Sequence, residues 1–303
     1  MFEPGPIPRN TGLALNISNK TIFQARPLAG DSRAENVLPP CGQRTAGIGK
    51  AMSVTSSTKS ESGLGETIRV VIHALLIALV IRTFLFQPFN IPSGSMKATL
   101  LVGDYLFVSK YSYGYSHYSI PLSPPLFSGR IFGSEPNRGD IVVFRLPKDD
   151  STDYIKRVIG LPGDRIQMRE GLLYINDKPV KRERLSDFIG EDPCGSDATA
   201  RVKRWKETLP NGVSYESLDC VDNGFYDNTN VYTVPAGHFF MMGDNRDNST
   251  DSRVLSAVGY VPFENIVGRA QMIFFSIAEG EHAWMFWRWP TAVRWNRLFT
   301  IVR

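Results

Sequence analysis

Residues 154–164 read YIKRVIGLPGD, an apolar run that ends in a tight turn. Aromatic and β-branched side chains favour extended strands, and the Pro-Gly-Asp sequence that follows is typical of a turn between strands. Comparable short runs, each bounded by turn residues, lie at residues 105–108, 141–144, 172–175 and 271–275. No long segment with the 3.6-residue period of a helix interrupts them after Pro92, so the sequence predicts a mainly β protein with antiparallel sheets.

A different pattern precedes these runs, because residues 67–87 are almost wholly apolar. About 20 helical residues span the ~30 Å hydrocarbon core of a bilayer, and Arg69 and Arg82 lie where their side chains can reach the two surfaces. We therefore expect one transmembrane helix, with a buried core helix or the apolar part of a cleaved signal peptide as alternatives. Cleavage is disfavoured because no small-x-small site follows. Flanking charges of both signs leave the orientation open.

Residues 1–66 are rich in Pro, Gly, Ser, Asn and Thr and lack a periodic apolar pattern. This composition predicts a disordered tail, to which we assign no chemistry. Met52 is an alternative start of translation, a hypothesis that N-terminal sequencing of the native protein tests.

The composition is that of a globular protein with an anchor. The 303 residues, of which 42% are hydrophobic, are enough to bury a sizeable core. The formal net charge is only +4 and basic residues are mixed with acidic ones, so no nucleic-acid partner is expected. Three cysteines without C-x-x-C spacing, and the absence of H-E-x-x-H, give no zinc signature, and we expect neither a metal nor a cofactor.

Two polar side chains are the candidates for chemistry: Ser95, within IPSGSM at residues 91–96, and Lys156, within the run quoted above. A lysine with its ordinary pKa of ~10.4 is protonated at pH 7, whereas burial lowers that pKa and leaves an amine that can accept a serine proton. Such a pair can do the work of a Ser-His-Asp triad. The plain alternatives are a solvated lysine beside Arg157, and His238 as the base.

Four motifs resemble, in order, the conserved boxes of bacterial type I signal peptidases (leader peptidases; the Ser/Lys-dyad peptidase family S26). They are PSGSM at residues 92–96, RGDIVVF at 138–144, YIKR with LPGD at 154–164, and GDNRDNS with DSR at 243–253. The resemblance implies an antiparallel β-sheet catalytic domain with an inserted smaller β-rich domain, preceded by one N-terminal transmembrane helix. We expect the catalytic domain at residues 88–175 and 232–283, the inserted domain at 176–231, and a Trp/Arg-rich C-terminal segment at 284–303.

The resemblance also implies roles for individual residues. Ser95 matches the nucleophile and Lys156 the general base, while the Ser93 hydroxyl and the Ser95 backbone N–H match the oxyanion-hole donors. One position departs from the family, because Ala98 stands where a proline is usual. Proline fixes φ and alanine does not, so we expect other contacts to hold the turn after the nucleophile.

Three further residues match supporting roles. Ser249 matches a serine that hydrogen-bonds the lysine amine, and Asp251 and Arg253 match an ion pair behind it. By the same resemblance, the pockets for small substrate side chains would be lined by Ile91, Pro92, Met96, Leu100, Tyr154 and Ile155.

The implied function is that of a membrane-bound serine endopeptidase that cleaves N-terminal signal peptides from exported preproteins after small residues (Ala-x-Ala). The implied location is the bacterial cytoplasmic (inner) membrane, single-pass, with the catalytic domain on the periplasmic or extracytoplasmic side. Its partners would be preproteins and the lipid bilayer, and we expect a monomer. The alternatives are a self-cleaving protease of the SOS-repressor type, for which residues 1–67 lack a helix-turn-helix pattern, and an inactive membrane-tethered scaffold.

Two features remain open at the level of sequence. Cys194 and Cys220 form a disulfide if this region is exported, or remain two free thiols. The aromatic and arginine side chains of residues 284–303 favour the headgroup layer of a membrane, with burial against the β core as the alternative.

Overall fold

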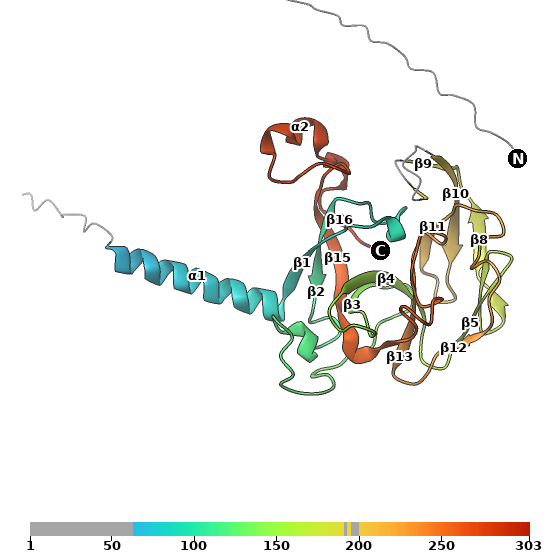
Figure 1. Cartoon of the computed structure of the whole chain (residues 1–303), viewed down its shortest axis with the longest axis horizontal. Helices are drawn as coiled ribbons and strands as arrows, with labels where there is room; N and C mark the ends of the chain where they lie inside the picture. Colours follow the sequence, from blue (N-terminus) through green and yellow to red (C-terminus); the bar gives the residue numbers. More distant parts are fainter. Residues whose placement is uncertain (1–62, 191–192, 195–199) are drawn as a thin grey trace, which may run out of the picture. The chain divides into compact units, whose positions relative to one another are not determined.

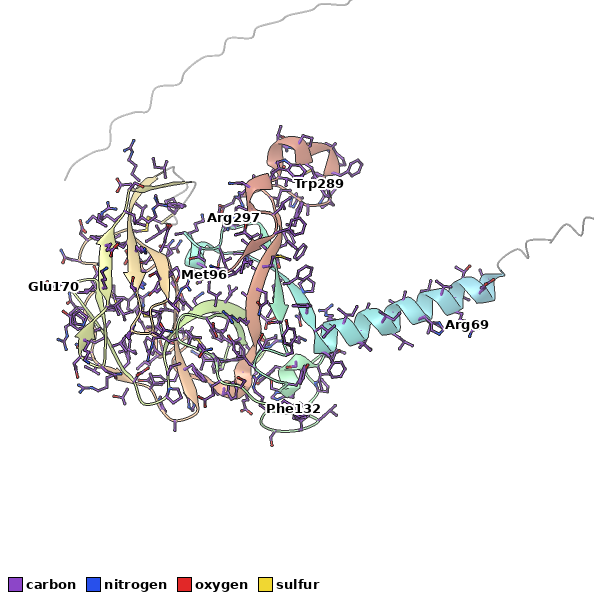
Figure 2. All side chains as sticks on the ribbon, turned by 180° about the vertical axis from the view of Figure 1, so that it is seen from behind. Arg69, Met96, Phe132, Glu170, Trp289 and Arg297 are labelled. Carbon is purple, nitrogen blue, oxygen red and sulfur yellow. A yellow bond between two sulfur atoms is a disulfide. The ribbon has the colours of Figure 1, made fainter. Side chains whose placement is uncertain are left out.

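The computed structural model describes residues 63–190, 193–194 and 200–303. It begins with α1 (Leu64–Phe84), whose mean hydropathy of 2.1 and lack of buried residues suit a membrane span (Figure 1). Figure 2 shows its side chains, Arg69 among them, pointing outward along the helix. The prediction of one long apolar helix is confirmed, and the helix begins three residues before residue 67 and ends at Phe84. The predicted tail up to residue 62, with Met52, lies outside the described residues.

The prediction of a mainly β fold with antiparallel sheets is also confirmed. The largest sheet has the strand order β1-β2-β15-β3-β4-β13-β14, with β16 beside β15, and all its pairings are antiparallel. Its strands are β1 (Phe86–Asn90), β2 (Asp104–Ser109), β3 (Ile141–Arg145), β4 (Asp153–Gly160), β13 (His238–Met242), β14 (Val261–Pro262), β15 (Ile266–Ser276) and β16 (Thr300–Ile301).

Two smaller sheets are built between β4 and β13, where the chain leaves the large sheet and returns to it. One contains β5 (Arg165–Arg169), β6 (Leu172–Ile175), β7 (Lys178–Pro179) and β12 (Tyr232–Thr233). The other contains β8 (Lys181–Arg184), β9 (Phe188–Gly190), β10 (Ala200–Thr208) and β11 (Ser214–Asp219). Strands β5 and β6 therefore belong to a sheet other than the large one. The domain boundary expected at residue 175 stays a prediction.

The β3–β4 hairpin explains why a lysine in this fold loses contact with water. Val142 of β3 pairs with Lys156 of β4. Ile141 and Val143 pack in one core cluster, and Val142 and Phe144 pack in another on the opposite face. A strand with both faces covered buries the residues it carries, and the last five residues of β4, 156–160, are all buried.

The C-terminal segment is anchored by a few small side chains and exposes its aromatic ones. It contains η4 (Phe286–Arg288), α2 (Trp289–Ala292) and η5 (Trp295–Arg297). Ala292 and Val293 are buried, whereas Trp284 is 68% exposed and Trp287 is 60% exposed. Trp289, labelled in Figure 2, packs against Phe275 of β15, with the two ring centroids 5.3 Å apart. The side chains of Trp284 and Trp287 are therefore exposed enough to contact a membrane surface or another molecule.

Candidate active site

The turn after β1 carries Ser95 in a short 3₁₀ helix, η1 (Gly94–Met96). Two buried anchors hold the turn from either side. Ile91 exchanges backbone hydrogen bonds with the segment 103–104, at 2.9 and 3.0 Å, and the side chain of Met96 is fully buried in the core. Apolar burial on both sides of a polar Ser-Gly-Ser sequence therefore leaves Ser95 in a defined position at the edge of the core.

Lys156 reaches this turn from β4. Its Nζ lies 2.7 Å from Ser95 Oγ and donates a hydrogen bond to Ile155 O at 2.9 Å. The lysine is only 3% exposed. Burial lowers the pKa of Lys156 from 10.5 to about 8, although the carboxylates of Asp251 and Asp244 oppose this shift. About a tenth of the amine is then neutral at pH 7, and a neutral amine can accept the proton of Ser95.

A buried cluster from the 243–253 motif lies behind the pair. Arg253 donates from Nε to Asp251 Oδ1 at 2.9 Å and from a terminal nitrogen to Oδ2 at 2.8 Å. Ser249 Oγ donates to Asp251 Oδ2 at 2.8 Å, and Gly243 N donates to the same oxygen at 3.0 Å. Burial opposes the charge of Asp251, but the Arg253 guanidinium and these donors hold the pKa of Asp251 below its usual range.

This arrangement differs from the sequence-based expectation for Ser249. Ser249 and Lys156 both line the same cavity, but no hydrogen bond joins them within the described part of the chain. The Ser249 hydroxyl donates its proton to Asp251 instead, because a carboxylate is a strong acceptor whereas a lysine ammonium has no lone pair to accept with. The geometry therefore joins Ser249 to Asp251 and not directly to the lysine.

A second buried ion pair was not predicted from the sequence. Arg157, next to Lys156 on β4, makes a bidentate contact with Asp244 at 2.8 and 2.7 Å. Thr99 Oγ1 donates to Asp244 Oδ2 at 2.5 Å, which links this pair to the turn after the nucleophile. Ala98 in that turn has a φ of 24°, which proline cannot adopt. The contact of Thr99 with Asp244 supplies the kind of support that was expected in place of proline.

A cavity of about 670 Å³ opens in front of Ser95 and Lys156, with Ser93 also in its wall. Ser93 Oγ lies 3.4 Å from Ser95 Oγ. Four of the residues expected to line the pockets do so, namely Ile91, Pro92, Tyr154 and Ile155. Met96 and Leu100 do not line this cavity, because both side chains are fully buried in the core beneath the turn. Both side chains pack in the same core cluster as Ile91, which does line the cavity.

Sequence reasoning did not identify one side of the cavity wall. These residues come from the loop after β11, from the 243–253 motif and from the residue that follows it: Tyr226, Asp247, Asn248, Thr250 and Val254. Tyr226 lies in a polar, turn-rich stretch with no local signal for binding. Its place in the wall depends on long-range folding.

Other candidate groups lie elsewhere. His238 Nδ1 lies 2.9 Å from Ala236 O, and His238 does not line the cavity. In residues 63–190, 193–194 and 200–303, no group of three or more His, Cys, Asp or Glu side chains is arranged to hold a metal ion. Among the described residues, Ser95 and Lys156 therefore remain the candidate catalytic pair.

Comparisons with known proteins agree with the motifs. A model of the family "Signal peptidase, peptidase S26" matches residues 64–275. Signal peptidase I of Rickettsia typhi is 49% identical over 228 residues, which cover 73% of this chain and 83% of that protein. Signal peptidase I of Rickettsia conorii is 51% identical over 210 residues, 67% of this chain and 76% of that protein. The crystal structure of a signal peptidase I from Enterococcus faecalis is 26% identical, covers 45% of this chain and 97% of that chain, and has a TM-score of 0.25.

Proposed function

Because the chain belongs to the signal peptidase family, peptidase S26, we propose that Ser95 and Lys156 are the residues with which it cleaves signal peptides from preproteins. Its activity is that of signal peptidase I, a serine peptidase. The observation that supports the two residues is the 2.7 Å separation of Lys156 Nζ and Ser95 Oγ at the wall of a cavity. Proximity of a nucleophile to a base of lowered pKa is what covalent catalysis requires.

The two residues act in a defined order. Neutral Lys156 takes the Ser95 proton as Ser95 Oγ forms a bond to the scissile carbonyl carbon. The carbon–nitrogen bond then breaks, the Lys156 ammonium returns its proton to the leaving amine, and an acyl-serine ester remains. Water attacks this ester with Lys156 again as base, which releases the signal peptide and restores Ser95.

The negative charge on the substrate oxygen is met by Ser93 Oγ and by the backbone N–H of Ser95. The 3.4 Å separation of the two serine hydroxyls supports this assignment, because it places Ser93 beside the atom that attacks. A preorganised donor of this kind contributes roughly 3 to 4 kcal/mol to lowering the barrier.

Small residues before the cleavage site, the Ala-x-Ala pattern, are selected by the apolar wall. Ile91, Pro92, Tyr154 and Ile155 narrow the cavity beside the nucleophile. Strand β1 ends the large sheet, so an extended substrate backbone can pair with its open edge, and Phe89 and Asn90 at its end also line the cavity. Main-chain hydrogen bonds then bind the peptide, and the limited space between the apolar side chains of the wall selects small substrate side chains.

The protein is anchored by α1 in the bacterial cytoplasmic membrane, with the sheets on the extracytoplasmic side. The Cys194–Cys220 disulfide supports this side, because such bonds persist in oxidising compartments. The exposed tryptophans of the C-terminal segment support contact with the headgroup layer. The protein works as a monomer on preproteins, with residues 176–231 as a domain inserted into the catalytic one.

Cleavage of a preprotein with an Ala-x-Ala site by the detergent-solubilised full chain tests the assignment. Wild type should release the signal peptide, and Ser95→Ala should not, as followed by mass spectrometry of both products. The matched control is Ser276→Ala, which removes another buried hydroxyl, one bonded to Asp104 at 2.6 Å outside the cavity. Cleavage that persists in Ser95→Ala, or is lost equally in the control, contradicts the assignment.

A further inference from the structure

Asn245 is fully buried and does not line the cavity, yet it contacts the turn that carries the nucleophile. Its side-chain Nδ2 donates to Gly94 O at 3.2 Å. Its backbone N donates to Ser95 O at 3.1 Å. Asn245 thus donates to the carbonyl groups on both sides of the Ser95 α-carbon.

The contact with Gly94 bears on the oxyanion hole through the geometry of one peptide unit. The Gly94 carbonyl and the Ser95 N–H belong to the same planar amide, so a hydrogen bond that fixes one also fixes the direction of the other. The Gly94 carbonyl also accepts a hydrogen bond from Lys97 N at 3.0 Å within the same 3₁₀ turn. Asn245 adds the side-chain donor, which ties this peptide plane to the 243–253 motif. A donor on the carbonyl also polarises the amide, which strengthens the N–H as a donor.

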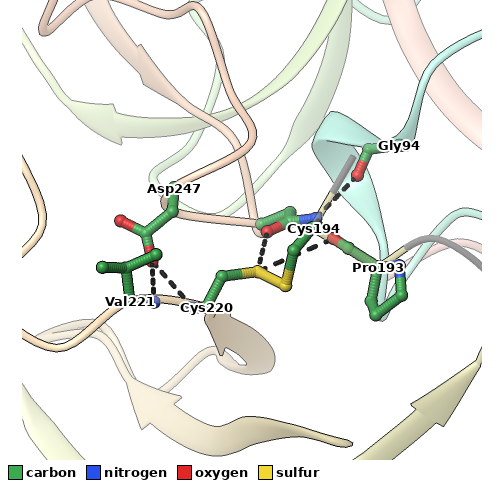
Figure 3. Close-up of a disulfide and its surroundings, with 7 residues drawn as sticks. Gly94, Pro193, Cys194, Cys220, Val221 and Asp247 are labelled. Atoms are coloured by element: carbon green, nitrogen blue, oxygen red, sulfur yellow. Dashed lines mark hydrogen bonds between the residues drawn. A yellow bond between two sulfur atoms is a disulfide. The ribbon is translucent and has the colours of Figure 1, made fainter. Parts of the chain in front are cut away.

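The second proton of the same amide nitrogen goes to a segment held by the disulfide. Asn245 Nδ2 donates to Pro193 O at 2.5 Å. Pro193 precedes Cys194, which is bonded to Cys220 with the Cα atoms 5.9 Å apart (Figure 3). Of the two possibilities left open by the sequence, the structure has the disulfide. The disulfide therefore fixes the partner that orients the Asn245 amide.

The other side of the disulfide is tied to the cavity wall. The backbone N of Cys220 and of Val221 donate to Asp247 Oδ2 at 2.7 and 3.0 Å. Figure 3 shows these contacts beside the disulfide, with Gly94 and Pro193 on its far side. Asn245 itself is flanked by backbone hydrogen bonds from Leu218 N to Asp244 O and from Arg246 N to Leu218 O, at 2.9 and 3.0 Å. Loss of the Asn245 side chain thus leaves the surrounding backbone supported.

We propose that Asn245 is a positioning residue that aims the Ser95 N–H at the oxyanion, and that the Cys194–Cys220 disulfide holds Asn245 in place through Pro193. The proposal rests on the proposed function of Ser95. The oxyanion exists only on the reaction path, so the contact acts on the transition state and not on the bound substrate.

The first test compares Asn245→Ala with wild type on an Ala-x-Ala peptide. We expect kcat to fall about tenfold or more, but less than the roughly 10²- to 10³-fold that follows outright loss of a donor, with KM changed little. The matched control is Asn265→Ala, because Asn265 is also buried and also donates to a backbone carbonyl, Arg145 O at 3.1 Å, away from the site. A kcat equal to that of the control, or a loss carried by KM, overturns the proposal.

The second test is a double-mutant cycle that includes Cys194→Ser/Cys220→Ser. In the wild-type background this change should lower kcat in the same direction as Asn245→Ala but by less. In the Asn245→Ala background it should have no further effect on kcat, because the link it acts through is already absent. Additive losses, or an unchanged kcat without the disulfide, overturn the link to the disulfide. The cysteine variant alone also keeps the proposal testable if Asn245→Ala does not fold.

The two proposals fail in different ways. If wild type does not cleave the peptide, or Ser95→Ala cleaves it, the proposed function fails whatever Asn245 does. If wild type cleaves, Ser95→Ala does not, and Asn245→Ala keeps the wild-type kcat, only the inference about Asn245 fails.

Discussion

Lys156 on β4 and Lys110 just after β2 lie in similar surroundings but have different partners. Lys156 is 3% exposed and Lys110 is 1% exposed. Burial is the main reason that the pKa of each is lowered from 10.5 to about 8. Lys156 Nζ lies 2.7 Å from the Ser95 hydroxyl, whereas Lys110 Nζ donates to the backbone oxygen of Ser119 at 2.5 Å.

The difference shows that a lowered pKa is not enough to make a base. A carbonyl oxygen has no proton to give, so Lys110 has nothing to deprotonate at that contact. Lys156 faces a hydroxyl that opens onto the cavity, and Asp251 and Asp244 stand behind it to stabilise the ammonium that forms on proton transfer. Perturbed pKa values therefore indicate a site only where the geometry of a reaction accompanies them.

The largest expected effect separates the two lysines by activity. Lys156→Met should lower kcat/KM on an Ala-x-Ala peptide by about 10⁴-fold, because the base is lost while the cavity and oxyanion donors remain. Lys110→Met, a matched loss of a buried amine, should keep activity of the wild-type order. Equal losses in the two variants, measured by initial rates on folded protein, would break the comparison.

The next effect concerns the ion pair beside Lys156, which has no counterpart among the contacts described at Lys110. Arg157→Met leaves Asp244 buried without its bidentate partner, so the free energy of unfolding should fall by about 3 to 5 kcal/mol. The control is Arg165→Met, whose partner Asp177 is half exposed, and the expected cost there is about 0 to 1 kcal/mol. Urea denaturation measures both. Similar costs would show that burial of the pair contributes little.

The third effect should be shared by both lysines. Each folded-state pKa, about 8, lies below the ordinary value of 10.5, so the unfolded chain binds more protons between these values. The free energy of unfolding of wild type should therefore rise with pH across this window. Lys156→Met and Lys110→Met should each be more stable than wild type at pH 7, by the order of 1 to 3 kcal/mol, and the gain should shrink toward pH 10. A gain that is constant with pH would exclude titration as its cause.

The smallest effect is a change in the pH profile. Because the neutral amine is the base, kcat/KM of wild type should rise about tenfold per pH unit below pH 8 and level off above it. Lys110→Met should keep this midpoint, although it removes a group of similar pKa. If the midpoint of the pH profile moved in Lys110→Met, the titration that controls activity would belong to Lys110 and not to Lys156.

The sequence alone determined the apolar helix, the predominance of antiparallel strands, and the identity of Ser95 and Lys156 as candidates. Each of these depends on local signals: an uninterrupted apolar run, short β-branched runs between turns, and four motifs in order. Such signals can be recognised without a structure, because the periods of strands and helices depend on residues that are close together in the sequence.

Only the tertiary structure decided which groups meet these candidates. Motif matching placed Met96 and Leu100 in the pockets, but the packing of the turn against the core directs both inward. Ser249 donates to Asp251, and Asn245 and the disulfide come to lie behind the turn that carries Ser95. The two Asn245 side-chain contacts, with Pro193 and with Gly94, join residues 52 and 151 positions apart in the sequence. The direction of a side chain and the charge nearest to it depend on such long-range packing, which no local pattern of residues records.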